Sequence, residues 1–497
     1  METIKEKDNE GLDQDSQECE RDSTNCTGVE IQITRLQRSL SLSNIVALML
    51  SATGHVSIFI TPSIILRLAG SLFSCMILWC LGSFGVYTMA LCFTEMATTF
   101  QKAGGPYLYV TETLGKLPGF LIAYGYIALI SGPFLAFLSQ TAALYIIAAF
   151  VIDADCDGGD YKAVSQILSG WILVTLTFLN CSFFKVVVKI QSFLTFMRLV
   201  AIGIIISCGL YFSLTSSVNN FKTPFEGSHF KPGSLSLAFV YVTFSLGGWQ
   251  AICPLTEEIK DPERTMPRAI KISFAIQVSL YLLTYLSYMS VLDKADIMGT
   301  KTVALLFCLQ IWRPLVVVLS MLVSVACMGA LNSGIMGHSR VLYAAARKGA
   351  MPSLLNTLHP RHKTPMMAIL ALALYGIILI YSGGTEVMME FIGLFSYIMS
   401  LNVVSGLLYL RYTQPALLRP YRVPTFLAVM QLFLGITLLL FIVYQRPVHM
   451  SIGIAIYLSG IPVYIFLVKS RDKPKFLTTF VGKMTMFCQK LLQQVHE

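Results

Sequence analysis

The chain has 497 residues, of which 55% are hydrophobic and only 13% are charged, and its mean hydropathy is +0.68. An ordinary soluble protein carries about 25% charged residues, so this composition excludes that class and indicates a polytopic membrane protein. The net charge of +9 does not indicate nucleic-acid binding, because the basic residues lie between apolar runs rather than in one patch.

The two ends of the chain are polar and flank a long apolar region. Residues 1–42 hold ten Asp/Glu against five Lys/Arg, a composition typical of a disordered tail, and no cleavable signal peptide is visible. We expect residues 1–42 to be a disordered cytosolic N-terminal tail and residues 469–497 to be a cytosolic C-terminal tail. Residues 43–468 should form one membrane domain.

Twelve apolar runs within residues 43–468 are predicted to span the membrane. If both termini are cytoplasmic, the inner loops hold 15 Lys/Arg and the outer loops hold 8, as the positive-inside rule requires. This asymmetry predicts a multi-pass protein with both termini in the cytoplasm. The runs lie near residues 43–67, 71–96, 119–150, 165–184, 190–212, 234–256, 270–291, 314–345, 366–382, 388–410, 424–444 and 450–468.

The first run is interrupted within residues 53–62, where Gly54, Ser57 and Pro62 lie close together. A helix in lipid must satisfy its backbone polar groups internally, so irregular backbone is tolerated only beside protein or a watery cavity. Unwound helices near the centre of the membrane are where transporters bind their substrates. The interruption therefore predicts one half of a binding site.

Few charged residues lie within the apolar runs, and such residues are functional candidates. Glu95 ends the second run, and Arg198 lies inside the fifth run with apolar residues on both sides. Arg340 lies near the inner end of the eighth run, where its long side chain can reach the membrane interface. Arg198 is the harder of the two arginines to explain in this way.

The sixth run has an interruption at residues 244–250, which contains Phe244, Ser245, Gly247 and Gly248. If the first ten runs form two halves of five, this position matches the first interruption. Glycine also allows close helix packing in membranes, so the segment alone has two explanations. Paired Gly-interrupted segments are typical of transporters with an inverted repeat, and beside such a segment Phe244 can cover a bound solute as a thin gate.

Cys156 lies in the predicted outer loop between the third and fourth runs. A leftover extracellular cysteine suggests an intermolecular disulfide, and a free surface thiol is the alternative. The seven histidines show no metal-binding spacing, and no Walker loop or nucleophile elbow occurs. The sequence therefore predicts no enzyme, no cofactor and no metal site.

Several blocks of the chain, taken in order, resemble the light subunits of heteromeric amino acid transporters, the L-type amino acid transporter family of the APC superfamily. The likeness runs from about residue 43 to 496, and no single motif carries it. The blocks are IFITP at 58–62, FTEMATT at 93–99 with KAGG at 102–105, GGW at 247–249 with TEE at 256–258 and DP at 261–262, NSG at 332–334 with SR at 339–340 and RKG at 347–349, RPYRVP at 419–424 and CQKL at 488–491.

The resemblance implies an all-α, APC/LeuT-like fold of twelve transmembrane helices with a five-plus-five inverted repeat and broken helices 1 and 6. It implies sodium-independent exchange of amino acids across the plasma membrane. In this family the loop between spans 3 and 4 carries a cysteine that is disulfide-bonded to a single-span glycoprotein heavy chain. Cys156 occupies that position, so a heavy chain is the expected partner.

The resemblance also assigns a role to Arg198. Related sodium-coupled carriers bind sodium between spans 1, 5 and 8, and this family typically has a span-5 lysine there. Arg198 occupies the matching position. Its guanidinium, which is always charged, is suited to substitute for a bound cation, which is why sodium independence is the hypothesis.

An amino acid presents a carboxylate and an ammonium to its carrier. We expect the carboxylate at the start of the half-helix after the first interruption, where free N–H groups and the helix dipole favour an anion. Carbonyls freed around the two interruptions would accept from the ammonium, and Phe244 would be the gate. The predicted substrate-binding residues are Gly54, His55, Val56, Ser57, Ile58, Phe244, Ser245, Gly247 and Gly248.

The chain departs from its family at His55-Val56-Ser57, where Gly-Ser-Gly is usual, and at Met399-Ser400 in span 10. The substrates of well-known members therefore do not transfer directly. The predicted substrate is a neutral L-amino acid with a large or aromatic side chain, because no acidic side chain is evident near either interruption. The aromatic-preferring branch of the family is one branch to which the chain could belong. His55 either replaces a glycine turn structurally or titrates and makes transport pH-dependent.

Two other functions remain open. One is an ion-coupled amino acid carrier of the same fold, which ion-replacement uptake measurements would identify. The other is a non-transporting paralogue that acts as a binding partner, for which reconstituted protein would show no counterflow of any amino acid.

Overall fold

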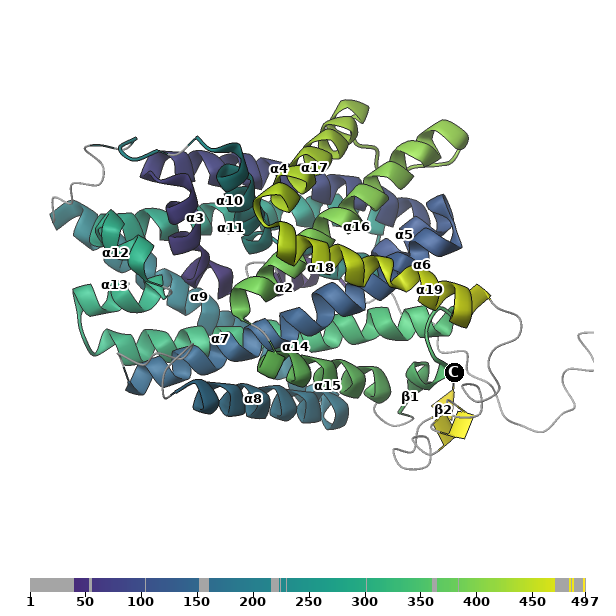
Figure 1. Cartoon of the computed structure of the whole chain (residues 1–497), viewed down its shortest axis with the longest axis horizontal. Helices are drawn as coiled ribbons and strands as arrows, with labels where there is room; N and C mark the ends of the chain where they lie inside the picture. Colours follow the sequence, from purple (N-terminus) through teal and green to yellow (C-terminus); the bar gives the residue numbers. More distant parts are fainter. Residues whose placement is uncertain are drawn as a thin grey trace, which may run out of the picture. The chain divides into compact units, whose positions relative to one another are not determined.

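Apolar helices make up most of the part of the chain that the structure describes (Figure 1). The structure is a computed structural model, and it describes residues 40–469 except 53–55, 103, 152–160, 216–222, 224, 229, 301, 360–363 and 383, together with 482–483, 485–486 and 495–496. Helices are expected for this composition, because only helices and closed barrels satisfy all backbone polar groups within lipid. The prediction of an all-helical membrane protein is confirmed.

Within the described ranges, nine helical stretches are long and apolar enough to cross a membrane, as a multi-pass protein requires. Each overlaps a run that the sequence predicted. They are α4 (Leu72–Phe100), α6 (Lys116–Gly125) with η3 (Tyr126–Ser131) and α7 (Gly132–Phe150), α8 (Lys162–Ser182), α9 (Phe184–Thr215), α11 (Pro262–Val291), α14 (Leu315–Arg347), α16 (Thr385–Thr413), α17 (Thr425–Gln445), and α18 (Pro447–Leu458) with α19 (Gly460–Val463) and η7 (Tyr464–Lys469).

The first predicted run is divided into separate helical pieces. α2 (Leu42–Ala52) ends just before residues 53–55, which the structure does not describe, and the 3-10 turn η2 (Val56–Phe59) and α3 (Thr61–Ala69) follow. Pro62 lies in the first turn of α3, where its missing N–H would have no helical partner in any case. The proline therefore favours a new helix start at this position.

The sixth predicted run is divided in a similar way. α10 (Pro232–Ser245) ends before the glycine pair, and the 3-10 helix η5 (Trp249–Glu258) begins after it. Gly248 has a φ of +98°, a conformation that glycine adopts without the strain a side chain would add. Pro254 lies inside η5 and removes a backbone donor. Local sequence thus explains both the end of α10 and the irregular helix after it.

α6 continues into α7 through the π-helical segment η3. Pro133, in the first turn of α7, has no N–H to donate to the carbonyl four residues before it, so the α-helical bonding pattern is disturbed there. The chain instead forms wider turns. The Gly132 N–H donates to the carbonyl of Ile127, and the Ser131 hydroxyl donates to the carbonyl of Tyr126 at 3.0 Å. Such π segments are rare and occur often at functional sites.

Shorter elements lie between and after the long helices. α5 (Gly105–Leu114) lies outside the predicted apolar runs, and its buried residues include Tyr107, Leu108 and Tyr109. α15 is an apolar helix of 17 residues. β1 pairs antiparallel with β2. The bounds are α12 (Lys294–Gly299), α13 (Val303–Ile311), η6 (Ser353–Leu355), β1 (Thr357–Leu358), α15 (Met366–Ser382) and β2 (Val495–His496).

α14 packs along α7 and also contacts α8 and α9 (Figure 1). Gly334 permits the close approach of α14 to α7, since a Cβ atom at this position would lie 2.5 Å from Cε1 of Phe134. Packed interiors do not absorb an overlap of that size without moving the ring. Gly334 therefore leaves the space that the Phe134 ring occupies.

A buried ion pair joins the C-terminal end of α4 to α16. Arg411 donates to Glu95 from Nε at 3.0 Å and from Nη2 at 2.5 Å, and the Val423 N–H donates to Glu95 Oε2 at 2.8 Å. The Glu95 side chain is 0% exposed and that of Arg411 is 7% exposed. A buried carboxylate requires such partners, so the bonds hold α4, α16 and the segment before α17 together.

Candidate substrate cavity

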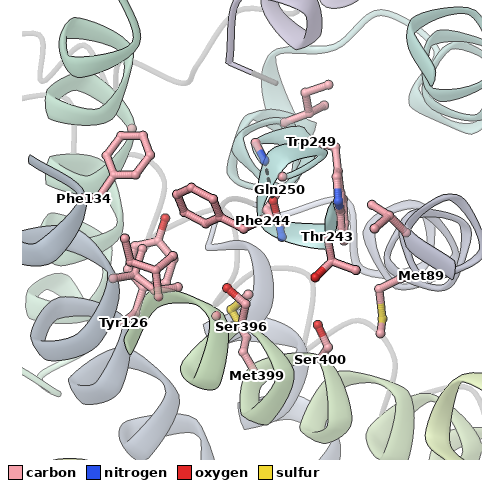
Figure 2. A pocket seen from close by; sticks show the side chains of 18 of the residues that line it. Met89, Tyr126, Phe134, Thr243, Phe244, Trp249, Gln250, Ser396, Met399 and Ser400 are labelled. Carbon is pink, nitrogen blue, oxygen red and sulfur yellow. Dashed lines mark hydrogen bonds between the residues drawn. The ribbon is translucent and has the colours of Figure 1, made fainter. Parts of the chain in front are cut away.

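A cavity of about 230 Å³ lies beside the interruption between α10 and η5 (Figure 2). Residues of α2, η3, α4, α7, α9, α14, α16 and α17 complete its walls. Pockets for drug-sized ligands usually measure about 300–1,000 Å³, so this volume suits one small solute. The walls are largely apolar with a few polar groups, which is typical of small-molecule sites.

Three of the predicted substrate-binding residues, Phe244, Gly247 and Gly248, line this cavity. The Phe244 ring projects into it from the end of α10 (Figure 2), and its centroid lies 5.8 Å from that of Phe137 in an edge-to-face arrangement. The Gly248 N–H donates to Oε1 of Gln250 at 3.0 Å. The Gln250 side chain thus closes the turn, and the glycines let the backbone itself form this wall.

A second wall is aromatic and contains a histidine that the sequence analysis did not assign to the site. Tyr126, Phe134 and His338 all line the cavity. The centroid of the His338 ring lies 5.3 Å from that of Tyr126 and 5.1 Å from that of Phe134. Nδ1 of His338 is buried and has no hydrogen-bond partner among the described residues. Its neighbours are distant in sequence, so no motif could have revealed this cluster.

α16 contributes a polar wall. Ser396 and Ser400, one helical turn apart, line the cavity, with Met399 beside them (Figure 2). Thr243 and Tyr397 also line the cavity, and their hydroxyls lie 2.9 Å apart and link α10 to α16. The sequence analysis noted Met399-Ser400 as a departure from the family, and the structure places both residues at the cavity.

Buried amides connect the cavity wall to α8. Gln191 donates to the Ser333 hydroxyl, Asn332 donates to Gln191 Oε1, and Asn180 donates to Asn332 Oδ1, each at 2.7 Å. Gln191 and Ser333 line the cavity. Because each amide is held by the next, the orientation of Gln191 at the cavity is fixed.

The first interruption contacts the second through hydroxyl groups. Ser57 and Ile58 are fully buried, and neither is among the described residues that line the cavity. The Ser57 carbonyl accepts from the Thr61 hydroxyl at 2.8 Å, and the Thr61 and Ser245 hydroxyls lie 2.9 Å apart. Ser245 is buried as well, so it joins the two broken segments at their point of contact.

Other predicted residues fall where the structure gives no description. Gly54, His55 and Cys156 lie outside the described residues, and the side chain of Val56 is also undescribed. Their roles at the substrate and at a partner chain stay predictions. Among the residues that are described, no group of three or more His, Cys, Asp or Glu could hold a metal ion.

Arg198 lies next to the first interruption. Its side chain comes from α9, the residue is 7% exposed, and Nη2 donates to the carbonyl of Leu50 in the last turn of α2. The last four carbonyls of a helix have no helical partner and carry the negative end of the helix dipole. The guanidinium therefore lies beside the described end of α2.

Comparison with known proteins gives one consistent family. The model of the family described as amino acid permease matches residues 40–468. The cystine/glutamate transporter of Homo sapiens is 30% identical over 465 residues, which are 93% of this chain and 92% of that protein. The Asc-type amino acid transporter 1 of Homo sapiens is 30% identical over 440 residues, 87% of this chain and 83% of that protein.

A third relative of Homo sapiens is the large neutral amino acids transporter small subunit 2, which is 28% identical over 449 residues. These residues are 88% of this chain and 82% of that protein. All three relatives are transporters rather than enzymes. The chain belongs to the amino acid permease family, and its relatives there are the light subunits of heteromeric amino acid transporters that the sequence resembles.

Proposed function

We propose that the chain is a sodium-independent exchanger of neutral amino acids with large or aromatic side chains, acting across the plasma membrane. The observation that carries this proposal is the cavity at the interruption after α10, with Phe244 projecting into it. Of the described residues that line the cavity, none is acidic, and the rings of Tyr126 and Phe134 favour a flat apolar side chain.

Twelve spans in a five-plus-five inverted repeat are part of the proposal. Nine long stretches are supplemented by the two divided runs, α2–α3 and α10–η5, and by α15. At 1.5 Å per residue, the 17 residues of α15 extend about 26 Å, close to the roughly 30 Å of the hydrocarbon core. Both termini then lie in the cytoplasm, as the distribution of basic residues favours.

In this proposal the substrate binds between the two interruptions. Its carboxylate lies near Val56, Ser57 and Ile58, its ammonium lies near carbonyls released where α10 ends, and its side chain enters the cavity beneath Phe244. The bond between Thr61 and Ser245 supports a coupled movement of the two segments. Exchange follows if the empty carrier reorients slowly, because each return step then requires a bound amino acid.

Sodium independence is supported by the contact of Arg198 with Leu50. A bound sodium ion would be stabilised by carbonyls at the same helix end, and the guanidinium supplies that positive charge permanently. We propose that Arg198 removes the need for a co-transported cation.

We also propose that the chain is the light subunit of a disulfide-linked heterodimer. Cys156 would bond to a single-span glycoprotein heavy chain, which the relationship to light subunits supports. The heavy chain would then be a partner outside the transport pathway.

The test is counterflow in proteoliposomes that contain the purified chain together with a heavy chain. Vesicles loaded with one amino acid are placed in a panel of labelled amino acids, with sodium or with choline as the only external cation. We expect rapid uptake of large neutral amino acids in loaded vesicles, slow uptake in empty vesicles and equal rates in both salts. Uptake that collapses in choline would establish an ion-coupled carrier, and no counterflow for any amino acid would establish a non-transporting protein.

A further inference from the structure

The imidazole of His338 is the polar group of the cavity whose role is least explained. Its Nδ1 atom is buried and has no hydrogen-bond partner among the described residues, although the residue lines the cavity. A buried polar atom left unpaired loses its hydration without replacement and so destabilises the fold. In a native structure such an atom calls for an explanation.

The His338 ring is held in a defined orientation. Tyr126 packs against it edge to face with an interplanar angle of 76°, and Phe134 packs against it with an angle of 52°. The Phe134 ring occupies space that a side chain at position 334 would need, and Gly334 leaves that space open. Aromatic contacts of this kind are directional, so the imidazole presents the same edge to any ligand.

The enclosure of Nδ1 also indicates where the proton lies. A neutral imidazole carries one N–H donor and one acceptor nitrogen. Orphaned N–H donors are rarer in proteins than acceptors with unused capacity, which favours the tautomer with the proton on Nε2. His338 would then offer a neutral N–H donor to the cavity, suited to an oxygen acceptor on the ligand.

The aromatic surroundings restrict which oxygen that is. A carboxylate placed among these rings would lose hydration that one neutral donor cannot replace, whereas a hydroxyl loses far less. Several other polar wall groups are already bonded, Thr243 to Tyr397, Gln250 to Gly248, and Gln191 to Ser333. Ser396, Ser400 and Arg340 also line the cavity, and the permanent charge of Arg340 suits a carboxylate better than a neutral imidazole does. The His338 edge is therefore suited to the end of a substrate side chain rather than to its carboxylate.

We propose that His338 is a specificity-determining residue, which donates a hydrogen bond to the hydroxyl of an aromatic amino acid and so favours tyrosine over phenylalanine. The proposal rests on the exchange function proposed above and names its preferred substrate class. Tyr126, Phe134 and Phe244 would hold the substrate ring, and His338 would bind the oxygen at its end.

The test compares two substrates that differ only in this hydroxyl. Exchange of tyrosine and of phenylalanine is measured in proteoliposomes with the wild-type chain, His338→Phe and His338→Gln. Loss of one neutral hydrogen bond, worth about 1.4 kcal/mol or tenfold, should lower kcat/KM for tyrosine about tenfold in His338→Phe. The value for phenylalanine should change less than twofold. His338→Gln keeps an N–H donor near Nε2 and should restore part of the tyrosine preference.

A structural role for His338 would lower both substrates equally, and an unchanged ratio of tyrosine to phenylalanine in His338→Phe would also overturn the proposal. Thermal stabilisation of the purified chain by each amino acid gives a second readout that does not require transport. A chain that is stabilised by tyrosine more than by phenylalanine, that loses this difference in His338→Phe and that shows no counterflow would support the His338 proposal and refute the exchange function. A wild-type chain stabilised by neither amino acid would refute both.

Discussion

Arg198 combines two properties that seldom occur together in a membrane helix, because it is charged and almost fully buried. The charged guanidinium has a defined partner, because it donates to the Leu50 carbonyl in the last turn of α2. Hydrogen bonds from charged donors contribute about 1.5–3 kcal/mol. This bond therefore stabilises the end of the first half-helix that the proposed site uses.

We expect Arg198→Met to lower the rate of exchange at least tenfold, because it removes the charge while keeping an unbranched side chain of similar bulk. Arg198→Lys keeps the charge and should retain more activity than Arg198→Met. Initial rates of counterflow across a sodium titration provide the measurement. Wild-type exchange by Arg198→Met would show that the cation at this helix end is dispensable.

The side chain of Phe244 should separate the substrate from the outer solution. Phe244→Ala removes the ring that projects into the cavity, so we expect a higher KM and faster efflux from loaded vesicles without external amino acid. Phe196→Ala is the matched control, because Phe196 is 59% exposed on α9 and far less enclosed. If efflux without external amino acid is equally fast in both variants, Phe244 does not act as a gate.

At the scale of elements, a buried ion pair between Glu95 and Arg411 ties α4 to α16. Breaking a buried pair costs about 3–5 kcal/mol, because the remaining charge loses its partner. We expect Glu95→Gln to lower Tm markedly in detergent, with Arg411 left among buried groups. Thermal unfolding of the purified chain measures this effect.

The control for Glu95 is the exposed pair of Glu112 and Lys348, whose charged atoms lie 3.8 Å apart with side chains 47% and 42% exposed. Exposed pairs contribute about 0–1 kcal/mol, so Glu112→Gln should hardly change Tm. Equal shifts for Glu95→Gln and Glu112→Gln would contradict the assignment of the buried pair as a structural tie.

The sequence predicted elements well wherever hydropathy and helix breakers decide them. Each of the nine long stretches overlaps a predicted run, and Gly248 and Pro62 mark real helix boundaries. Hydropathy cannot show α5, whose residues form a short buried helix outside the apolar runs, or the π segment η3, which depends on the position of Pro133. Phe244, Gly247 and Gly248 were found because local backbone chemistry reveals them. His338, Tyr126 and Gln191 were not, because only tertiary packing brings them to one cavity.

For the whole molecule, the proposed assembly depends on a residue outside the described part. We expect co-expression with the cognate heavy chain to give a covalent adduct that reducing agents dissociate. Cys156→Ser should abolish the adduct while some non-covalent association and exchange remain. Cys80→Ser is the control, because Cys80 is an exposed free cysteine on α4. Non-reducing electrophoresis distinguishes the two, and an adduct that survives in Cys156→Ser would place the bond elsewhere.

The π segment η3 makes chain length itself a determinant of the cavity. Each residue turns an α-helix by about 100°, so deleting one residue within Tyr126–Ser131 would rotate the preceding part of α6 by about that angle relative to α7. Tyr126 would leave the cavity wall and a neighbouring side chain would take its place. If a related carrier lacks one residue in this segment, that single deletion would change which side chains of η3 face the cavity. Alignments across this segment should therefore be read for gaps as closely as for substitutions.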